Sequence, residues 1–395
     1  MSKCCTNQAE LTGFEWFGQM IPRCLEYAKR AVAEGRPIVG IMCEYAPREL
    51  IIAAGAVPVC LCGGDPDTIP KAETRLPANL CPLVKSTYGF LVQHANPFLE
   101  MADLVIAEAT CDGKKKMFEL MGLDLPTYLI EIPQREDSDQ AILFLAKEFR
   151  NLKTYLEDQF KVKITDAKLR QAIQLMNSER RLRRSIAYLM KANPPPITGR
   201  QVLECKSIIS CIPEDLKQYQ AIMDRFINTG QTESDGTNGR VRVLLTGVPI
   251  VHGMERIVDI IEAHRVVIVA QENCTGLKPI MEDVEEDHPD PIHALAKKYS
   301  VIPCSIKTPN SKRLDLIRHL VKEFRAQAVI DLVWHACLTY SVESFWIKKL
   351  AEQELGIPYL QIDTDYYLAD AERIGMRVEA LVETVASGNP KNQSL

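Results

Sequence analysis

The sequence predicts an α/β protein with two doubly wound, Rossmann-like parallel-sheet domains and a helical segment between them. Three observations lead to this prediction. Short apolar segments typical of buried strands alternate with helical segments in the first third of the chain, the same alternation returns after residue 240, and a long charged stretch with helical periodicity separates the two. Strands and helices that alternate at this spacing are typical of parallel sheets with crossover helices.

The first alternating unit follows an amphipathic helix over residues 14–34, which we expect to be interrupted near Pro22. A helix that opens at Pro47 and ends near Gly55 connects the first two strands, since proline suits a first helical turn and glycine a helix end. Four strands are expected, at 37–42, 57–62, 102–109 and 125–132. We assign residues 1–138 to this N-terminal helix and the first domain.

Residues 139–192 are long, charged and periodic at helical spacing, and three prolines at 194–196 follow them. Two shorter helices are expected near 199–210 and 214–228, and the polar, glycine-bearing stretch 230–240 is the expected boundary. The helical segment and linker therefore cover residues 139–235, and the second domain covers 236–395. Its strands are expected at 241–247, 266–271, 328–333 and 357–362, and its last helix at 370–386.

The two alternating units resemble each other. Residues 103–116 and 328–343 both run through a strand, a short turn, a cysteine and a helix. A pseudo-two-fold relation between the units would let their strand ends face each other across a cleft.

Composition excludes several classes of protein. The net charge is −5 without a basic stripe, so nucleic acid is not an expected partner. The sequence contains no run of about 18 apolar residues, so no membrane span is expected. The N-terminus lacks the features of a signal peptide, and we therefore expect a cytoplasmic protein. In such a reducing compartment the 13 cysteines are not expected to form disulfides and need another explanation.

Six cysteines form two triplets with similar spacing. The steps are 38 and 30 residues in the first triplet and 30 and 33 in the second, and no pair is a CxxC. At least four of the six follow a predicted strand, where open α/β sheets place their ligands. The triplets are Cys43, Cys81 and Cys111, and Cys274, Cys304 and Cys337.

Thiolates are soft ligands that select zinc, copper(I) or iron–sulfur clusters. Single cysteines on separate strand ends suit a larger inorganic unit between two domains better than a compact zinc knuckle. Three thiolates can hold a cubane with one open iron, and six can hold two such cubanes. For the other cysteines we expect structural roles: core packing for Cys24, Cys60, Cys62, Cys205 and Cys211, and an incidental place in the terminal tail for Cys4 and Cys5.

Charged residues adjoin the proposed ligands. Candidate proton donors, or groups that orient the ligands, are Glu44, Asp112, Glu272 and His335. The three lysines at 114–116 fit a solvated helix face better than a positive field beside an anionic cluster. The acidic run 282–290 is expected to be an exposed loop, and Gly63-Gly64-Asp65 a simple turn. The chain has no P-loop and no dinucleotide-binding glycine motif.

At these residues the chain resembles the family of 2-hydroxyacyl-CoA dehydratase and benzoyl-CoA reductase subunits. The resemblance covers nearly the whole chain from about residue 15. Its motifs lie at residues 43–50 and 53–58, at Cys81-Pro82, at 110–115, at His335-Ala336-Cys337, and at 357–366 followed by 377–380.

The resemblance implies a ligand set. Dehydratase subunits of this family hold one [4Fe-4S] cubane with three cysteines, which match Cys81, Cys111 and Cys337 here. With Cys43, Cys274 and Cys304 added, the set looks like that of double-cubane cluster proteins, which carry an [8Fe-9S] cluster of two bridged [4Fe-4S] units. The dehydratase pattern suggests that a cubane draws ligands from both domains.

The resemblance also implies a reaction and partners. A separate ATP-hydrolysing iron–sulfur activator would supply low-potential electrons, which agrees with the missing P-loop, and the cluster would reduce a small molecule such as acetylene. The same resemblance implies a homodimer. Independently of the resemblance, Glu44 and His335 adjoin proposed ligands, so for this reaction we expect them to be proton donors or groups that orient the ligands. Two alternatives stay open: a dehydratase or reductase subunit with a single [4Fe-4S] cluster, and a non-catalytic zinc or electron-storage protein.

Overall fold

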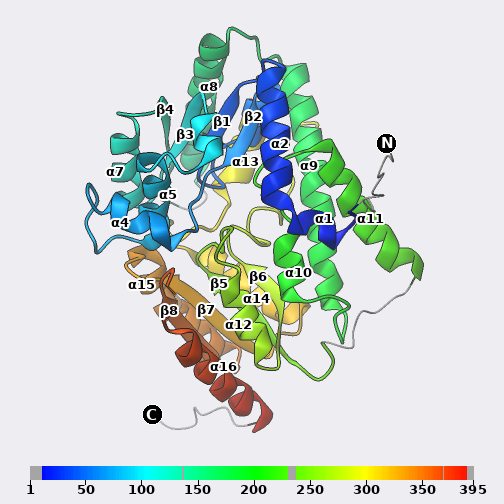
Figure 1. Cartoon of the computed structure of the whole chain (residues 1–395). Helices are drawn as coiled ribbons and strands as arrows, with labels where there is room; N and C mark the ends of the chain where they lie inside the picture. Colours follow the sequence, from blue (N-terminus) through cyan, green and yellow to red (C-terminus); the bar gives the residue numbers. More distant parts are fainter. Residues whose placement is uncertain (1–10, 136–137, 230–236, 368, 389–395) are drawn as a thin grey trace, which may run out of the picture.

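Two four-stranded parallel sheets form the framework of the protein. The computed structural model describes residues 11–135, 138–229, 237–367 and 369–388. Figure 1 shows the two sheets in separate lobes, one above the other, with helices packed on their faces. The predicted fold class, two α/β units with parallel sheets, is confirmed.

The two sheets share one strand order, β2-β1-β3-β4 in the first lobe and β6-β5-β7-β8 in the second. This common order agrees with the resemblance between the two halves of the sequence. The strands are β1 (Ile38–Ile41), β2 (Val57–Cys60), β3 (Leu104–Ala109), β4 (Thr127–Glu131), β5 (Val241–Gly247), β6 (Val266–Glu272), β7 (Ala328–Trp334) and β8 (Tyr359–Thr364).

The sequence predicted the strands to within a few residues. Except for the edge strands β4 and β8, the strands are buried along nearly their whole length, and buried strands appear in the sequence as short apolar runs. In the first sheet Ile41 of β1 pairs with Cys60 of β2 and with Ile106 of β3. The carboxyl ends of these strands therefore meet at one edge of the sheet, which faces the other lobe (Figure 1).

Helices precede, connect and follow the strands. In the first lobe they are α1 (Phe14–Gly18), α2 (Met20–Ala33), α3 (Arg48–Ala53), α4 (Ile69–Ala72), α5 (Pro82–Val92), α6 (Pro97–Glu100) and α7 (Asp112–Met121). The middle segment holds α8 (Asp139–Phe160), α9 (Asp166–Tyr188), α10 (Gly199–Glu204) and α11 (Pro213–Thr229). The last part holds α12 (Arg256–Ala263), α13 (Pro291–Ser300), α14 (Ser311–Glu323), α15 (Leu338–Lys349) and α16 (Ala371–Ala386). Single turns lie at Pro66–Thr68, Leu189–Lys191 and Leu350–Glu354.

The N-terminal helix is interrupted earlier than predicted. The break lies at Gln19, between α1 and α2, so Pro22 falls in the first turn of α2 instead of ending a helix. A proline is tolerated there because the backbone N–H groups of the first helical turn have no hydrogen-bond partner within the helix. The N–H group that proline lacks would therefore have made no helical hydrogen bond.

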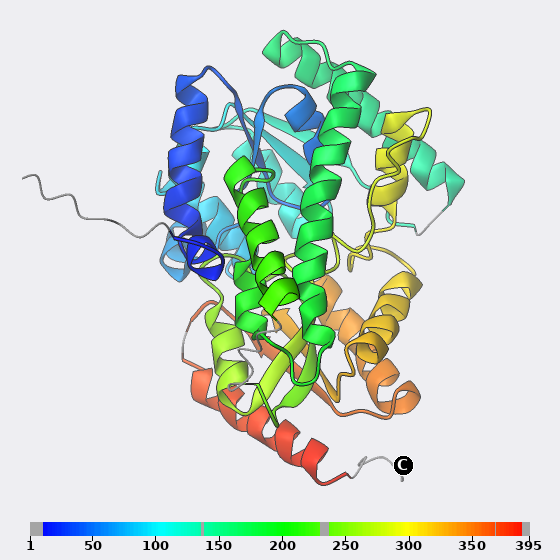
Figure 2. The same cartoon turned by 90° about the vertical axis from the view of Figure 1, so that its right-hand side faces the viewer.

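Helix α9 joins the two lobes. In the first lobe Arg180 donates to Glu49 of α3 at 2.5 Å, and towards the second lobe Arg184 donates to the carbonyl oxygen of Ile280 at 2.7 Å. Figure 2 shows α9 as the long green helix that runs from one lobe into the other. The middle helical segment is therefore a brace between the lobes.

Helix α13 lies in the first lobe, although its sequence belongs to the second alternating unit. It packs against α8, where the rings of Phe149 and Tyr299 meet edge to face at 5.7 Å, and its apolar residues join the core under β1 and β3. Both views place this yellow helix beside the first sheet (Figures 1 and 2). The chain therefore crosses from β6 to the first lobe and back, and the boundaries 138/139 and 235/236 stay predictions.

The acidic run 282–290 is a loop with exposed residues, as we expected, but some of its acidic side chains are also bound to neighbouring elements. Arg181 of α9 donates to Asp283 at 2.5 Å and to Glu286 at 2.7 Å, and Asp290 caps α13 by accepting from the backbone of Ile292. The acidic side chains therefore hold the crossing segment against α9.

Glycines make a close contact between the lobes. A Cβ atom on Gly64 would lie 1.9 Å from the carbonyl oxygen of His252, and Gly253, with φ +96°, sits against Gly64 in turn. Tyr366 of the second lobe donates to the carbonyl oxygen of Gly63 at 3.1 Å. The stretch predicted as a simple turn is therefore part of the contact between the lobes.

Among the described residues, no helix is both long enough and apolar enough to span a bilayer.

Candidate functional site

A cavity of about 400 Å³ lies between the lobes at the carboxyl ends of the strands, and eight cysteines line it. They include all six cysteines of the two predicted triplets. The other two are Cys60 and Cys62, for which we expected core packing. Most of the remaining lining is apolar and includes Met42, Leu83, Val248, Ile306, Trp334 and Leu338.

Strand ends and helix starts place the six predicted thiols. Cys43, Cys111 and Cys274 each stand two residues after a strand, and Cys337 stands three residues after β7. Cys81, Cys111 and Cys337 are the N-cap residues of α5, α7 and α15. A helix N-terminus carries partial positive charge, so these three helices favour thiolates and anionic groups in the cavity.

Cys304 arrives by a different route. It follows α13, at the point where the crossing segment returns towards the second lobe, and its backbone N–H donates to Ile302. Tyr45 of the first lobe donates its hydroxyl proton to the carbonyl oxygen of Ile302 at 2.9 Å and so fixes this stretch against the first lobe.

The ligand set that the resemblance implies, Cys81, Cys111 and Cys337, leaves a second group of three, Cys43, Cys274 and Cys304. The two groups are not electrostatically separate, since Cys304 acts on Cys111. In the first group the interaction between the neighbouring thiols of Cys81 and Cys337 lowers the pKa of Cys81 and raises that of Cys337, and the charge of Cys111 acts on Cys81. In the second group, burial raises the pKa of Cys43, and Cys304 and Cys274 raise it further. Each group takes cysteines from both lobes.

Cys60 and Cys62 pack against the cores, as we expected, but they also border the cavity, which we did not expect. Both thiols line the cavity and both residues are half-buried. Because side chains alternate along an extended strand, the spacing of two residues turns Cys60 and Cys62 to the same side. Leu61, between them, points to the other side and is buried in the core. A hydrogen bond with Cys62 lowers the pKa of Cys60 to about 7, in spite of burial.

Lys114 also differs from our expectation. Its ammonium group points into the first lobe, donates to the carbonyl oxygen of Met42 at 2.8 Å and lies 3.4 Å from Glu108 Oε2. Burial alone would lower the pKa of Lys114, but the charges of Cys43 and Glu108 raise it above its ordinary value. Lys115 and Lys116 are the exposed members of the run.

Two of the four candidate proton donors line the cavity, Glu44 and Asp112. Burial would raise the pKa of Glu44, yet its ion pair with Arg48, at 2.7 Å, holds the pKa below its ordinary value. Asp112 is almost fully exposed. A carboxylate with a lowered pKa is a better ion-pair partner than a proton donor near neutral pH.

The other two candidates lie away from the cavity lining. His335 is more than half exposed and pairs with Asp363. Glu272 is fully buried, with Lys278 at 2.8 Å and Arg313 at 3.3 Å. Neither His335 nor Glu272 lines the cavity, although the charge of Glu272 acts on Cys274.

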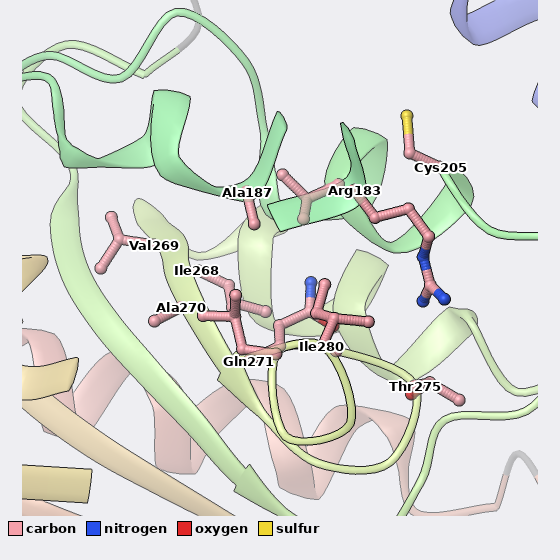
Figure 3. A pocket seen from close by; sticks show the side chains of 12 residues that line it. Arg183, Ala187, Cys205, Ile268, Val269, Ala270, Gln271, Thr275 and Ile280 are labelled. Atoms are coloured by element: carbon pink, nitrogen blue, oxygen red, sulfur yellow. The ribbon is translucent and has the colours of Figure 1, made fainter. Parts of the chain in front are cut away.

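The remaining described cysteines lie elsewhere. Cys24 is buried and its thiol lies 3.1 Å from the hydroxyl of Ser207, and Cys211 lies 3.3 Å from the sulfur of Met176. Cys205 borders a separate cavity of about 20 Å³, enough for one water molecule. Figure 3 shows Cys205 and Arg183 on one side of it and residues 268–271 on the other. Cys4 and Cys5 lie outside the described residues.

The donor set of the large cavity is chemically uniform. Among the described residues, no three His, Cys, Asp or Glu side chains surround a single ion position. Eight thiols around one cavity are soft donors, and helix N-termini and Lys114 supply positive charge beside them. These residues fit an anionic, thiolate-bound cofactor such as an iron–sulfur cluster.

Comparison with known proteins identifies the family. Residues 43–385 match the family described as 2-hydroxyglutaryl-CoA dehydratase, D-component. The chain belongs to the 2-hydroxyacyl-CoA dehydratase family. The match begins at Cys43 and includes every cysteine of both triplets, so the resemblance inferred from the motifs is confirmed.

Named relatives span nearly the same length. YjiM of Escherichia coli (strain K12), whose name describes a dehydratase subunit, is 38% identical over 88% of this chain and 91% of its own. The beta subunit of (R)-phenyllactyl-CoA dehydratase from Clostridium sporogenes is 26% identical over 89% and 92%. The beta subunit of (R)-2-hydroxyglutaryl-CoA dehydratase from Acidaminococcus fermentans (strain ATCC 25085 / DSM 20731 / CCUG 9996 / CIP 106432 / VR4) is 22% identical over 89% and 93%. All three are similar to this chain across both lobes.

Proposed function

We propose that this member of the family is the substrate-reducing component of an iron–sulfur reductase, with a double-cubane [8Fe-9S] cofactor in the thiol-lined cavity. The supporting observation is that a second group of three thiols, Cys43, Cys274 and Cys304, borders the same cavity as Cys81, Cys111 and Cys337. A single cubane held by three thiolates leaves the second group without a role.

The residues of the chain would hold and tune the cofactor. The six thiolates would be the ligands, Cys43, Cys81 and Cys111 from the first lobe, Cys274 and Cys337 from the second, and Cys304 from the crossing segment. The N-termini of α5, α7 and α15 would offset their negative charge. Lys114 adds a fixed positive charge beside Cys43. The apolar lining keeps water from the site. When bound, the cluster would supply low-potential electrons for reduction of a small molecule such as acetylene.

A second candidate is a 2-hydroxyacyl-CoA dehydratase or benzoyl-CoA reductase subunit with a single [4Fe-4S] cluster on Cys81, Cys111 and Cys337. The names of the relatives favour this candidate over the first, since they describe dehydratase subunits. Under this reading the second group of thiols is free, and the chain works with a different subunit on an acyl-CoA substrate.

Metal and sulfide analysis of protein purified without air distinguishes the candidates. We expect about eight iron atoms per chain for the double cubane and about four for the single cubane, on the ligand logic of iron–sulfur sites. A zinc-containing, colourless protein would support the third reading, a zinc protein, and would refute both others.

Two substitutions make the test sharper. Cys304→Ala should lower the iron content under the double-cubane proposal, whereas the single-cubane proposal expects no change. Cys111→Ala should lose iron under both. Cys205→Ala, beside the small separate cavity, is the matched control and should keep the iron content of the wild type. Unchanged iron in the Cys304 variant would refute the double cubane.

The partners are also proposals. Electrons would come from an ATP-hydrolysing iron–sulfur activator, and the chain itself would hydrolyse no ATP, in line with its missing P-loop. ATP turnover by the pure protein without an activator would contradict this. A homodimer and a cytoplasmic location stay predictions, and sedimentation analysis at several concentrations tests the first.

A further inference from the structure

Cys60 and Cys62 are the cavity thiols that the proposed cofactor does not use. Six thiols make two groups of three, and these two remain in the same lining. They stand two residues apart at the end of an edge strand, so both side chains point to the cavity side.

The backbone on both sides of the pair is fixed. Cys60 pairs with Ile41 of β1 in the sheet register, and its N–H donates to the carbonyl oxygen of Ile208 at 2.7 Å on the outer side. The thiol of Cys62 donates to the carbonyl oxygen of Met42 at 3.2 Å. The fold therefore holds the two sulfurs close enough for each to shift the pKa of the other.

Positive charge surrounds the pair. Arg48 acts on Cys60 and favours a thiolate there, while Glu44, its ion-pair partner, acts in the opposite direction. The buried ammonium group of Lys206, which donates to the carbonyl oxygen of Ile250 at 2.9 Å, also interacts electrostatically with Cys60. The interaction with Cys60 and burial raise the pKa of Cys62 well above its ordinary value, and Lys114 opposes this rise only in part. Two cysteine thiols on one side of a strand, beside buried cations, can together bind a soft ion.

We propose that Cys60 and Cys62 form a separate dithiol site that binds one soft, thiophilic ion. The inference rests on the proposed function in one respect, the assignment of the other six thiols to the cofactor. Binding replaces two S–H bonds by two bonds from sulfur to the ion and releases two protons. With phenylarsine oxide as the ligand, two As–S bonds form, and the oxygen leaves as water together with both thiol protons.

The test uses phenylarsine oxide on the holoprotein, purified without air, with intact mass and iron content as the readouts. All proteins in the test carry Cys4→Ser and Cys5→Ser, because these adjacent thiols would chelate the arsenical themselves. In this background we expect the otherwise wild-type chain to gain one phenylarsenic group. Cys60→Ser and Cys62→Ser should each lose this gain, because one thiol cannot chelate, and should keep the iron content of the wild type. Cys205→Ser, a buried cysteine at the separate small cavity, is the control and should still gain one group.

Three results would overturn the proposal: no uptake by the wild type, unchanged uptake by the Cys60 and Cys62 variants, or loss of iron in these variants, which would make the pair cluster ligands. Failure of the proposed function gives a different result. A wild type without iron would expose all eight thiols to the arsenical, and the Cys60→Ser/Cys62→Ser double variant would then bind one group fewer than the wild type.

Discussion

Lys114 puts an ammonium group inside the protein, between the cavity thiols and a buried carboxylate. Its partner Glu108 is fully buried, and Oε1 of that carboxylate has no hydrogen-bond partner. Burial raises the pKa of Glu108, and Lys114 opposes this rise. The positive charge of Lys114 therefore reduces the free-energy cost of burying the Glu108 carboxylate.

Lys114→Met should lower the free energy of unfolding by about 1–3 kcal/mol at pH 7, since it leaves a buried acceptor without its partner. The pKa of Glu108 rises further without the lysine, so the folded state holds the proton to higher pH than the unfolded state. Stability should then fall more steeply as pH rises above the unfolded value of about 4.3. Urea denaturation between pH 5 and pH 8 measures both effects.

Lys115→Met is the matched control for this prediction. Lys115 is 41% exposed and pairs with the exposed Asp112, so its loss should change stability by less than about 0.5 kcal/mol. Equal effects of the two substitutions would show that the position of Lys114 in the core has no energetic consequence.

Single residues also show the limit of sequence reasoning at the site. The six thiols could be predicted from their type and from their places after strands and in family motifs. Lys114 could not, because a run of three lysines in a first helical turn does not say which one turns inwards. The cavity position of Cys60 and Cys62 could not be predicted either. The alternation in β2 shows that both side chains lie on one side of the strand, but not that this side faces a cavity.

At the scale of elements, α3, α9 and α13 meet at one buried carboxylate. Glu49 of α3 accepts from Arg180 of α9 at 2.5 Å and from the hydroxyl of Tyr299 of α13 at 2.8 Å. Glu49 is fully buried and the side chain of Arg180 is 4% exposed. Burial would raise the pKa of Glu49, but Arg180 holds it below the ordinary value.

Glu49→Gln should lower the free energy of unfolding by about 3–5 kcal/mol at pH 7, because it leaves the Arg180 guanidinium buried without a counter-ion. Since the folded pKa of Glu49 is lowered, the carboxylate stabilises the protein fully above the unfolded value of about 4.3 and loses this effect as pH falls through the folded pKa. The difference between wild type and variant should therefore shrink in acid. Denaturation at pH 7 checks the size, and denaturation at several pH values from 4 down to 2 checks the sign.

Glu119→Gln serves as the control, as Glu119 is 66% exposed in a surface pair with Lys116. Its effect should stay below about 1 kcal/mol. A Glu49 variant that behaved like this control would contradict the role of the buried ion pair in joining the three helices.

Helices and strands could be predicted where a single pattern of apolar residues was enough to locate them. Buried strands read as apolar runs, so their positions followed from the sequence. The place of α13 did not, because an amphipathic pattern shows that a helix buries one face but not against which lobe. The return of the chain from α13 is also what brings Cys304 to the cavity, so this ligand position depends on contacts between distant segments.

At the scale of the whole molecule, the site exists only while the two lobes keep their relative position. Each group of three thiols draws on both lobes, Cys81 and Cys111 with Cys337, and Cys43 with Cys274 and Cys304. Helix α9 and the crossing segment around α13 join the lobes, and the backbones of Gly64 and Gly253 touch at their contact. A small shift between the lobes would therefore disturb both groups at once.

Gly64→Ala tests this dependence without touching a thiol. The added methyl group would lie 1.9 Å from the carbonyl oxygen of His252, which is backbone and cannot move aside alone, so the lobes must separate or tilt. Overpacking of this kind costs about 1–3 kcal/mol, and we expect a lower melting temperature together with less iron per chain. Gly18→Ala, whose Cβ would meet nothing within 4 Å, should change neither. A Gly64 variant that lost stability but kept all its iron would show that the cofactor site tolerates displacement of the lobes, and that the six thiols do not depend on this contact.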